Sequence, residues 1–118
     1  MTAKTYVSRS IEIEAIQFVG GKDNVHEIQD WVRAHADGLL EDHAVFVTKG
    51  MAQGPQAWRY IKNDSQWSED VVAAVYDVLH ETWVGVKVGQ WIIRGTKGEF
   101  YPCEDEVFRQ KYYEKESV

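Results

Sequence analysis

The clearest pattern near the start of the chain is an alternation of apolar and charged residues from Ser10 to Phe18 (SIEIEAIQF). Ile11 and Ile13 alternate with two glutamates, which is the period of two that a β-strand gives to its two faces. Toward the end of the segment both faces become apolar. We therefore expect a strand over Ser10 to Phe18 whose second half lies inside a sheet.

A helical period follows and predicts a helix from Asn24 to Ala36. The apolar positions with helical spacing are Val25, Ile28, Trp31 and Val32. Asp23 or Asn24 can cap this helix, and Glu27 stands three residues after Asn24, as in a capping box at a helix start. Asp37-Gly38 then supplies a glycine suited to a left-handed helix end.

Two short segments rich in β-formers, Ala44 to Thr48 and Trp58 to Lys62, are predicted strands. The sequence GMAQGPQ between them holds two Gly and one Pro, so we expect a loop there. Glu69 to Val75 has two interpretations, because Ser68 is a suitable helix N-cap while the valine-rich sequence favours a strand. We favour a hairpin with a two-residue turn at His80-Glu81.

The last part of the chain predicts three more strands, joined by glycine-containing turns, and a final helix. The strands are Trp83 to Val88, Trp91 to Arg94 and Glu99 to Tyr101. Pro102 is expected to close the last strand, since proline cannot donate to a ladder. Glu104 to Tyr113 has acids in its first turn and an apolar side, as in a helix. The prediction is a single α+β domain spanning 1–118, mostly antiparallel β-sheet, with one long helix in the N-terminal half and a short C-terminal helix.

Composition agrees with one domain of ordinary globular type. Of 118 residues, 44% are apolar and 27% are charged, and a chain of this length supports one hydrophobic core. Five Trp, six Tyr and four Phe favour a compact core or an aromatic-lined surface. The net charge of -6 argues against a general nucleic-acid binder, which needs clustered Lys and Arg, although Lys87, Arg94 and Lys97 allow a local cationic patch.

Cysteine and histidine usage excludes two kinds of site. Cys103 is the single cysteine, so no intramolecular disulfide forms, and the four His show no metal-ligand spacing. The start of the chain lacks a signal-peptide core, and no apolar run approaches the roughly 20 residues that span a bilayer. We expect a cytoplasmic protein with no membrane contact, no metal and no cofactor.

The block from Gly89 to Cys103 (GQWIIRGTKGEFYPC) is the first place to look for a binding site. We predict that one face of its two strands holds Trp91, Ile93 and Phe100. The other face then holds Ile92, Arg94, Glu99 and Tyr101. This arrangement would place a cation, an anion and a ring side by side, either as a cross-strand salt bridge on a solvated face or as a binding surface. The candidate binding residues are Trp91, Arg94, Lys97, Glu99, Tyr101 and His80.

None of these residues forms a recognised catalytic motif. GTKG is too short for a phosphate loop and lies between strands. Cys103 could act as a nucleophile, but the acids after it would raise its pKa, and a structural role is favoured. His80 is expected to be a solvated turn residue, with general-base duty as the alternative. We therefore predict no catalytic residues.

The same block, with the strand at the start of the chain, resembles a family of small uncharacterised proteins of tailed phages and prophages. Proteins of that family commonly end in VxxGDWIIKGxxGEFYPC and carry an IEAIQF-like strand, here Glu12 to Phe18. The segment Tyr76 to Val86 (YDVLHETWVGV) is similar to the version in actinobacterial phages. Three departures are Gln90, where Asp is usual, Glu104-Asp105, where Lys-Pro or Asp-Pro is usual, and TYVSRS before the first strand, where a basic-Pro segment is usual. The resemblance implies phage origin and no catalytic residues.

Two functional hypotheses follow. The first is a non-enzymatic phage accessory protein that binds a host protein and modulates it in the host cytoplasm. The second is a binder or sponge for a nucleotide-derived signal in counter-defence, in which Trp91 or Tyr101 stacks on a base and Arg94 or Lys97 meets phosphate. Such side chains would converge most easily at a homodimer interface. An enzyme is the third possibility and would need a pocket that joins Cys103 or His80 to a second polar group.

Overall fold

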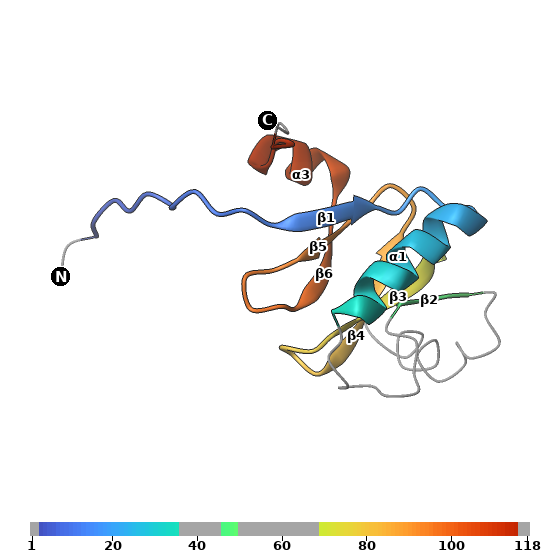
Figure 1. Ribbon diagram of the computed structural model, residues 1–118. Helices are drawn as coiled ribbons and strands as arrows, with labels where there is room; N and C mark the ends of the chain where they lie inside the picture. The colour runs from blue at the N-terminus through green and yellow to red at the C-terminus, as the bar shows by residue number, and fades with distance from the viewer. Residues whose placement is uncertain (1–2, 36–45, 50–68, 116–118) are drawn as a thin grey trace.

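Six strands and two helices form the described part of the protein in the computed structural model, which covers residues 3–35, 46–49 and 69–115 (Figure 1). The elements are β1 (Glu14–Gln17), α1 (Lys22–Ala34), β2 (Phe46–Thr48), β3 (Val71–Asp77), β4 (Thr82–Lys87), β5 (Trp91–Arg94), β6 (Phe100–Cys103) and α3 (Asp105–Lys111). The predicted α+β class, with a long helix in the N-terminal half and a short C-terminal one, is confirmed. The predicted strand Trp58 to Lys62, the loop before it and the predicted helix end at Asp37-Gly38 lie outside the described residues.

The strands divide into two three-stranded antiparallel sheets, ordered β1-β5-β6 and β2-β3-β4. The chain passes from the second sheet to the first at the turn between β4 and β5. In the first sheet Glu14 lies opposite Arg94 and Gln17 lies opposite Trp91. The alternating segment near the start of the chain and the block Gly89 to Cys103 are therefore paired neighbours, although they come from opposite ends of the sequence.

Residues Val71–Asp77 form strand β3, so the favoured hairpin is confirmed and the alternative helix is wrong. The turn, however, takes in residues 78–81 and is longer than the predicted pair His80-Glu81. Asp77 explains the longer turn, because its Oδ1 accepts hydrogen bonds from the backbone N–H groups of Leu79 at 3.0 Å and His80 at 3.2 Å. Glu81 completes the turn with φ 52°.

Strand β6 runs through Pro102 to Cys103, which corrects the prediction that Pro102 closes the strand. The backbone N–H of Gly95 donates to the carbonyl of Glu99 at 2.7 Å. Hydrogen-bonded and non-hydrogen-bonded pairs alternate from that point, so Pro102 opposite Ile92 is a non-hydrogen-bonded pair. The missing N–H of Pro102 faces the outer edge of the sheet, where no ladder bond is lost.

One hydrophobic core joins α1 to both sheets. Its buried members are Phe18, Ile28, Val32, Phe46, Ala73, Val75, Val86, Ile92 and Phe100. Trp31 of α1 packs edge-on against Phe100 of β6, with 5.1 Å between ring centroids. Phe18 meets Phe46 in the same way at 5.6 Å. These contacts place α1 on the Phe100 face of the first sheet, and Figure 1 shows α3 on the other side of β1.

The start of α1 differs from the prediction. The helix begins at Lys22, and Asn24 lies inside it and caps nothing. Instead, the Asn24 side-chain oxygen accepts from the backbone N–H groups of Val19 at 2.9 Å and Gly20 at 3.2 Å, and its amide donates to the carbonyl of Gln17 at 2.9 Å. The predicted capping box is therefore wrong, because Asn24 holds the β1–α1 connection and not the helix terminus.

Strand β1 is shorter than predicted, since it begins at Glu14 and not at Ser10. Residues 3–13 form an extended segment, here called the arm, that continues in the direction of β1 away from the body of the protein (Figure 1). In the described part of the chain, no helix is long and apolar enough to cross a membrane.

Candidate functional site

The register of the β5–β6 hairpin overturns the predicted faces of the block Gly89 to Cys103. Arg94 lies opposite Phe100, and Ile93 lies opposite Tyr101. Cross-strand partners point to the same side of a sheet, so Arg94 shares its face with Phe100, and Tyr101 shares the opposite face with Trp91. The predicted faces assumed a pairing that is shifted by one residue from the observed register. Such a shift places all side chains of one strand on the wrong face of the sheet.

The side chain of Trp91 holds α3 against the sheet by a ring stack and a hydrogen bond. Its indole ring lies flat on the ring of Phe108, with 4.1 Å between centroids and 7° between planes. Its Nε1–H donates to Asp105 Oδ1 at 2.8 Å, and Arg109 Nε donates to the same oxygen at 2.8 Å. The Trp91 hydrogen bond, with help from Arg109, lowers the pKa of Asp105. Trp91 is therefore an anchor for α3 on this face.

Tyr101 and Cys103 lie on the same face, where each is partly covered. Burial, followed by the charge and hydrogen bond of Tyr112, raises the pKa of Tyr101 to about 12. Burial also raises the pKa of the Cys103 thiol; Lys111 opposes this rise and Glu104 adds to it. The expected influence of the acids after Cys103 is thus present, although burial contributes more. Neither group is activated for nucleophilic attack at neutral pH.

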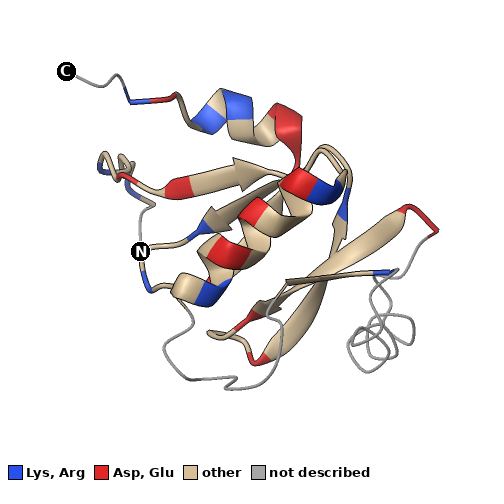
Figure 2. Ribbon diagram, turned by 45° about the vertical axis from the view of Figure 1, so that its right-hand side comes forward, with Lys and Arg blue, Asp and Glu red and all other residues tan. Residues whose placement is uncertain are grey.

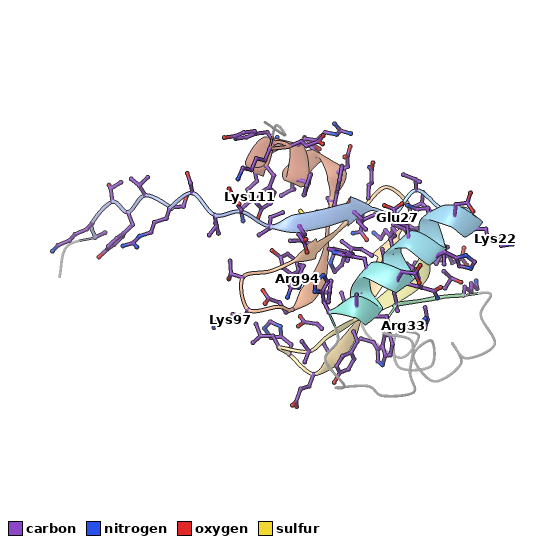
Figure 3. The ribbon with its side chains drawn as sticks, viewed as in Figure 1. Lys22, Glu27, Arg33, Arg94, Lys97 and Lys111 are labelled. Atoms are coloured by element: carbon purple, nitrogen blue, oxygen red, sulfur yellow. The ribbon has the colours of Figure 1, made fainter. Side chains whose placement is uncertain are left out.

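Arg94 belongs to a polar cluster on the opposite face, next to the C-terminal end of α1 (Figure 3). Glu14 Oε1 accepts a hydrogen bond from Trp31 Nε1 at 3.3 Å and lies at ion-pair distance from His35 Nε2, at 3.7 Å, and Arg94 NH1, at 3.9 Å. Arg94 Nε is buried and has no hydrogen-bond partner among the described residues. We call these four residues the Arg94 cluster.

Sequence reasoning found Arg94 but missed the other three members of this cluster. Trp31 occupies an apolar helical position, and the pairing of Glu14 with Arg94 follows only from the contact between β1 and β5. The expected cross-strand ion pair of Arg94 does form, but with Glu14 in place of Glu99.

The remaining candidates lie elsewhere. Lys97 is at the tip of the β5–β6 hairpin, and its backbone N–H donates to Glu99 Oε2 at 3.1 Å (Figure 3). His80 lies in the hairpin of the other sheet, where its Nδ1 is 2.8 Å from Asp77 Oδ2. Lys87, expected to join Arg94 and Lys97 in a cationic patch, is 3.9 Å from Asp70 Oδ2. The six predicted binding residues are thus spread over both sheets and both faces of one sheet.

A second candidate surface lies where the β1–α1 and β4–β5 connections meet. The Phe18 N–H donates to the Gln90 carbonyl at 2.9 Å, and the Gly89 N–H donates to the Phe18 carbonyl at 2.7 Å. Val19 and Val88 extend from these connections and are 59% and 58% exposed. We call this pair of connections, residues 19–21 and 88–90, the turn surface.

Glycines and side-chain amides fix the shape of the turn surface. Gly20, Gly21 and Gly89 have φ of 85°, 87° and 98°, a left-handed backbone that other residues adopt at a cost. Gln17 Nε2 donates to the Gly89 carbonyl at 3.0 Å. The Gln90 side chain accepts from the Lys87 N–H at 2.7 Å.

Gln90 also joins the turn surface to α3. Its Nε2 donates to Glu104 Oε1 at 2.9 Å. This hydrogen bond connects the β4–β5 connection to the residue that precedes α3.

Within residues 3–35, 46–49 and 69–115, no group of three or more His, Cys, Asp or Glu side chains is placed to hold a metal ion. The chain matches no model of a known protein family, no curated protein and no solved structure.

Proposed function

We propose that the protein is a non-enzymatic binding module for another protein, and that, as its resemblance to tailed-phage proteins implies, it binds and modulates a host protein in the host cytoplasm. The observation that carries the proposal is the turn surface. Two valines are held out toward solvent there by connections whose backbone is fixed by hydrogen bonds.

A fixed surface binds at lower cost than a mobile one. Ordering loops and side chains on association consumes binding free energy, and the hydrogen bonds of Asn24 and Gln17 have already done that ordering. Covering the exposed parts of Val19 and Val88 contributes at about 25 cal/mol per Å² of apolar surface. This free energy is appropriate for a small, specific contact in which the two valines enter a shallow apolar depression on a partner.

The charge beside the turn surface favours a partner with basic groups. Helix α1 starts directly after Gly21 and carries exposed acids at Asp23, Glu27 and Asp30, which share one side of the helix. Figure 2 shows these acids as red bands along α1, with basic residues at its two ends. A stripe of this kind steers encounter with a basic surface and orients it next to the two valines.

The binding of a nucleotide-derived ligand is the second candidate, and the Arg94 cluster favours it. Among the described residues the buried Nε of Arg94 has no hydrogen-bond partner, and NH1 of the same side chain is 3.9 Å from Glu14 Oε1. A phosphate oxygen would supply an acceptor for Arg94, and the neighbouring ring is Trp31 in place of the expected Trp91 or Tyr101. A thermal-shift series with nucleotides should then raise the melting temperature of the wild type but not of Arg94→Gln. A flat response in both proteins excludes this candidate.

The test of the protein-binding proposal is affinity capture from a host lysate with the tagged full chain. We expect one host protein at stoichiometric level, and we expect Val19→Asp with Val88→Asp to lose it. Tyr113→Asp is the matched control, because Tyr113 is 93% exposed and lies beyond α3. Equal capture by the wild type and the double variant would remove the turn surface from the proposal, and no stoichiometric partner would remove the proposal itself.

A further inference from the structure

We propose that two copies of the chain associate through their arms, each arm pairing antiparallel with the arm and the free β1 edge of the other copy. The two β1-β5-β6 sheets would then form one continuous six-stranded sheet. This association goes beyond partner binding at the turn surface and uses a different part of the molecule.

The arm has the properties of a strand without a partner. It is extended, and among the described residues its backbone makes no hydrogen bond to the rest of the chain. Tyr6, Val7 and Ile11 are 86%, 90% and 58% exposed. The side-chain contact that the described residues give the arm is Lys115 Nζ to Glu12 Oε1 at 2.7 Å, between two highly exposed groups. A surface ion pair of this kind contributes little and does not hold the arm in place.

Strand β1 supplies the edge that such an arm needs. Among the strands in the described part of the chain it lies at the outside of the sheet, with β5 on its inner side. The Phe18 N–H points toward β5, so alternate residues back along the strand do the same. The N–H and C=O groups of Ala15 and Ile13 therefore point to the open edge. Unpaired edges of this kind pair readily with another extended chain.

The sequence of the arm is complementary to itself in one register. Odd-numbered residues carry the outward groups, so a ladder between two copies pairs odd positions with odd positions. When the twofold axis passes through Ile11, Ile11 faces its own copy. Val7 then faces the partner's Ala15, and Tyr6 faces the partner's Ile16. Every one of the three exposed apolar residues of the arm meets an apolar residue.

Neighbouring registers are less favourable. A twofold axis through Arg9 places the two copies of Arg9 opposite each other. An axis through Glu12 places the two copies of Glu12 opposite each other. An axis through Ser10 places Tyr6 opposite Glu14. The axis at Ile11 opposes no like charges, since Glu12 and Glu14 face serines. Self-complementarity at one register is the reason a second copy, and not an unrelated strand, is the occupant.

The first test is the molar mass of the full chain in solution, measured by light scattering over a range of concentrations. We expect a dimer for the wild type and a monomer for Ile11→Asp, which places two aspartates at the twofold axis. Val88→Asp is the matched control and should remain dimeric, because it changes the turn surface only. Loss of the host partner in Val19→Asp with Val88→Asp, while the dimer persists, would separate failure of one proposal from failure of the other. A monomeric wild type at every concentration overturns the arm pairing.

The second test determines which residues of the two arms lie opposite each other. In a Cys103→Ser background, Ile11→Cys places two cysteines opposite each other and should give a covalent dimer under mild oxidation. Val7→Cys places its cysteine opposite the partner's Ala15 and should therefore give much less covalent dimer. Equal cross-linking of the two variants would refute the register. At concentrations too low for the dimer to form, circular dichroism and the urea midpoint should match the parent protein for both variants under reducing conditions, because the side chains of Val7 and Ile11 are largely exposed in the single chain.

Discussion

The indole of Trp91 and the ring of Phe108 lie parallel, with 4.1 Å between their centroids and 7° between their planes. Helix α3 spans Asp105–Lys111 and buries none of its residues completely. A helix this short is not stable alone in water, so its position depends on side-chain contacts. The stack of Trp91 on Phe108, with the Trp91 hydrogen bond to Asp105, is the main contact that holds α3 to the sheet.

Replacing Phe108 should therefore release α3. Phe108→Ala is expected to lower the free energy of unfolding by about 2 kcal/mol, below the range for a fully buried phenylalanine because Phe108 is half-buried. Urea denaturation measures the loss, and hydrogen exchange of the α3 amides should become fast. Val107→Ala, on the exposed side of the same helix, is the control with little change. Equal losses in the two variants would show that the stack does not hold α3.

Substitution of Asp77 should lower the free energy of unfolding more than is usual for a residue beside a turn. Its carboxyl is buried and accepts from the backbone N–H groups of Leu79 and His80. Asp77→Ala leaves those donors without their acceptor and should cost about 1–3 kcal/mol. Asp77→Asn keeps the Oδ1 acceptor and should cost less. Urea midpoints that rank the two variants in the opposite order would contradict this account.

Tyr101 should make the protein less stable in strong alkali. The pKa of Tyr101 is raised to about 12, whereas a tyrosine in the unfolded chain ionises near pH 10. Between these values the unfolded chain releases its proton first, so the free energy of unfolding should fall as pH rises from about 10 to 12, and the contribution is fully present below pH 10. Urea denaturation across this range measures the fall. Tyr101→Phe should show a shallower fall than the wild type, and identical slopes would exclude Tyr101 as the source.

The two glycines of the β5–β6 turn should respond differently to alanine. Gly98 has φ 82°, so Gly98→Ala is strained and should cost about 1–2 kcal/mol. At Gly95 an added Cβ would meet the Glu99 carboxyl, the end of a flexible side chain that can move away. Gly95→Ala should therefore cost less, and the cost should disappear in a Glu99→Ala background. A persistent cost there would place the conflict in the backbone.

The local pattern of the chain was sufficient for most elements but not for their pairing. Trp91–Arg94 is a strand with the predicted bounds, because β-branched residues between two glycine turns leave few alternatives. The faces of the hairpin were wrong, because periodicity defines two faces on each strand without defining which residue lies opposite which. That choice depends on the turn, where Gly95 pairs with Glu99.

The candidate site was less predictable than the fold. The sequence indicated Arg94, but its partners Glu14, Trp31 and His35 come from a strand and a helix far along the chain. The turn surface was missed because exposed valines and glycines carry no recognisable chemistry. Asn24 shows the same limit, since its spacing to Glu27 fits a capping box while its real contacts are with β1 and the connection that follows it.

The pairing of β1 with β5 also has a consequence for the growing chain on the ribosome. Gln17 contacts Gly89 across 72 residues of sequence, and β5 is the partner of β1 among the described strands. While the C-terminal quarter is still inside the exit tunnel, β1 has no neighbour and the core lacks Ile92 and Phe100. The first sheet therefore forms only after β5 and β6 have left the tunnel, and a chain shortened before β5 leaves its N-terminal strand available for incorrect pairing.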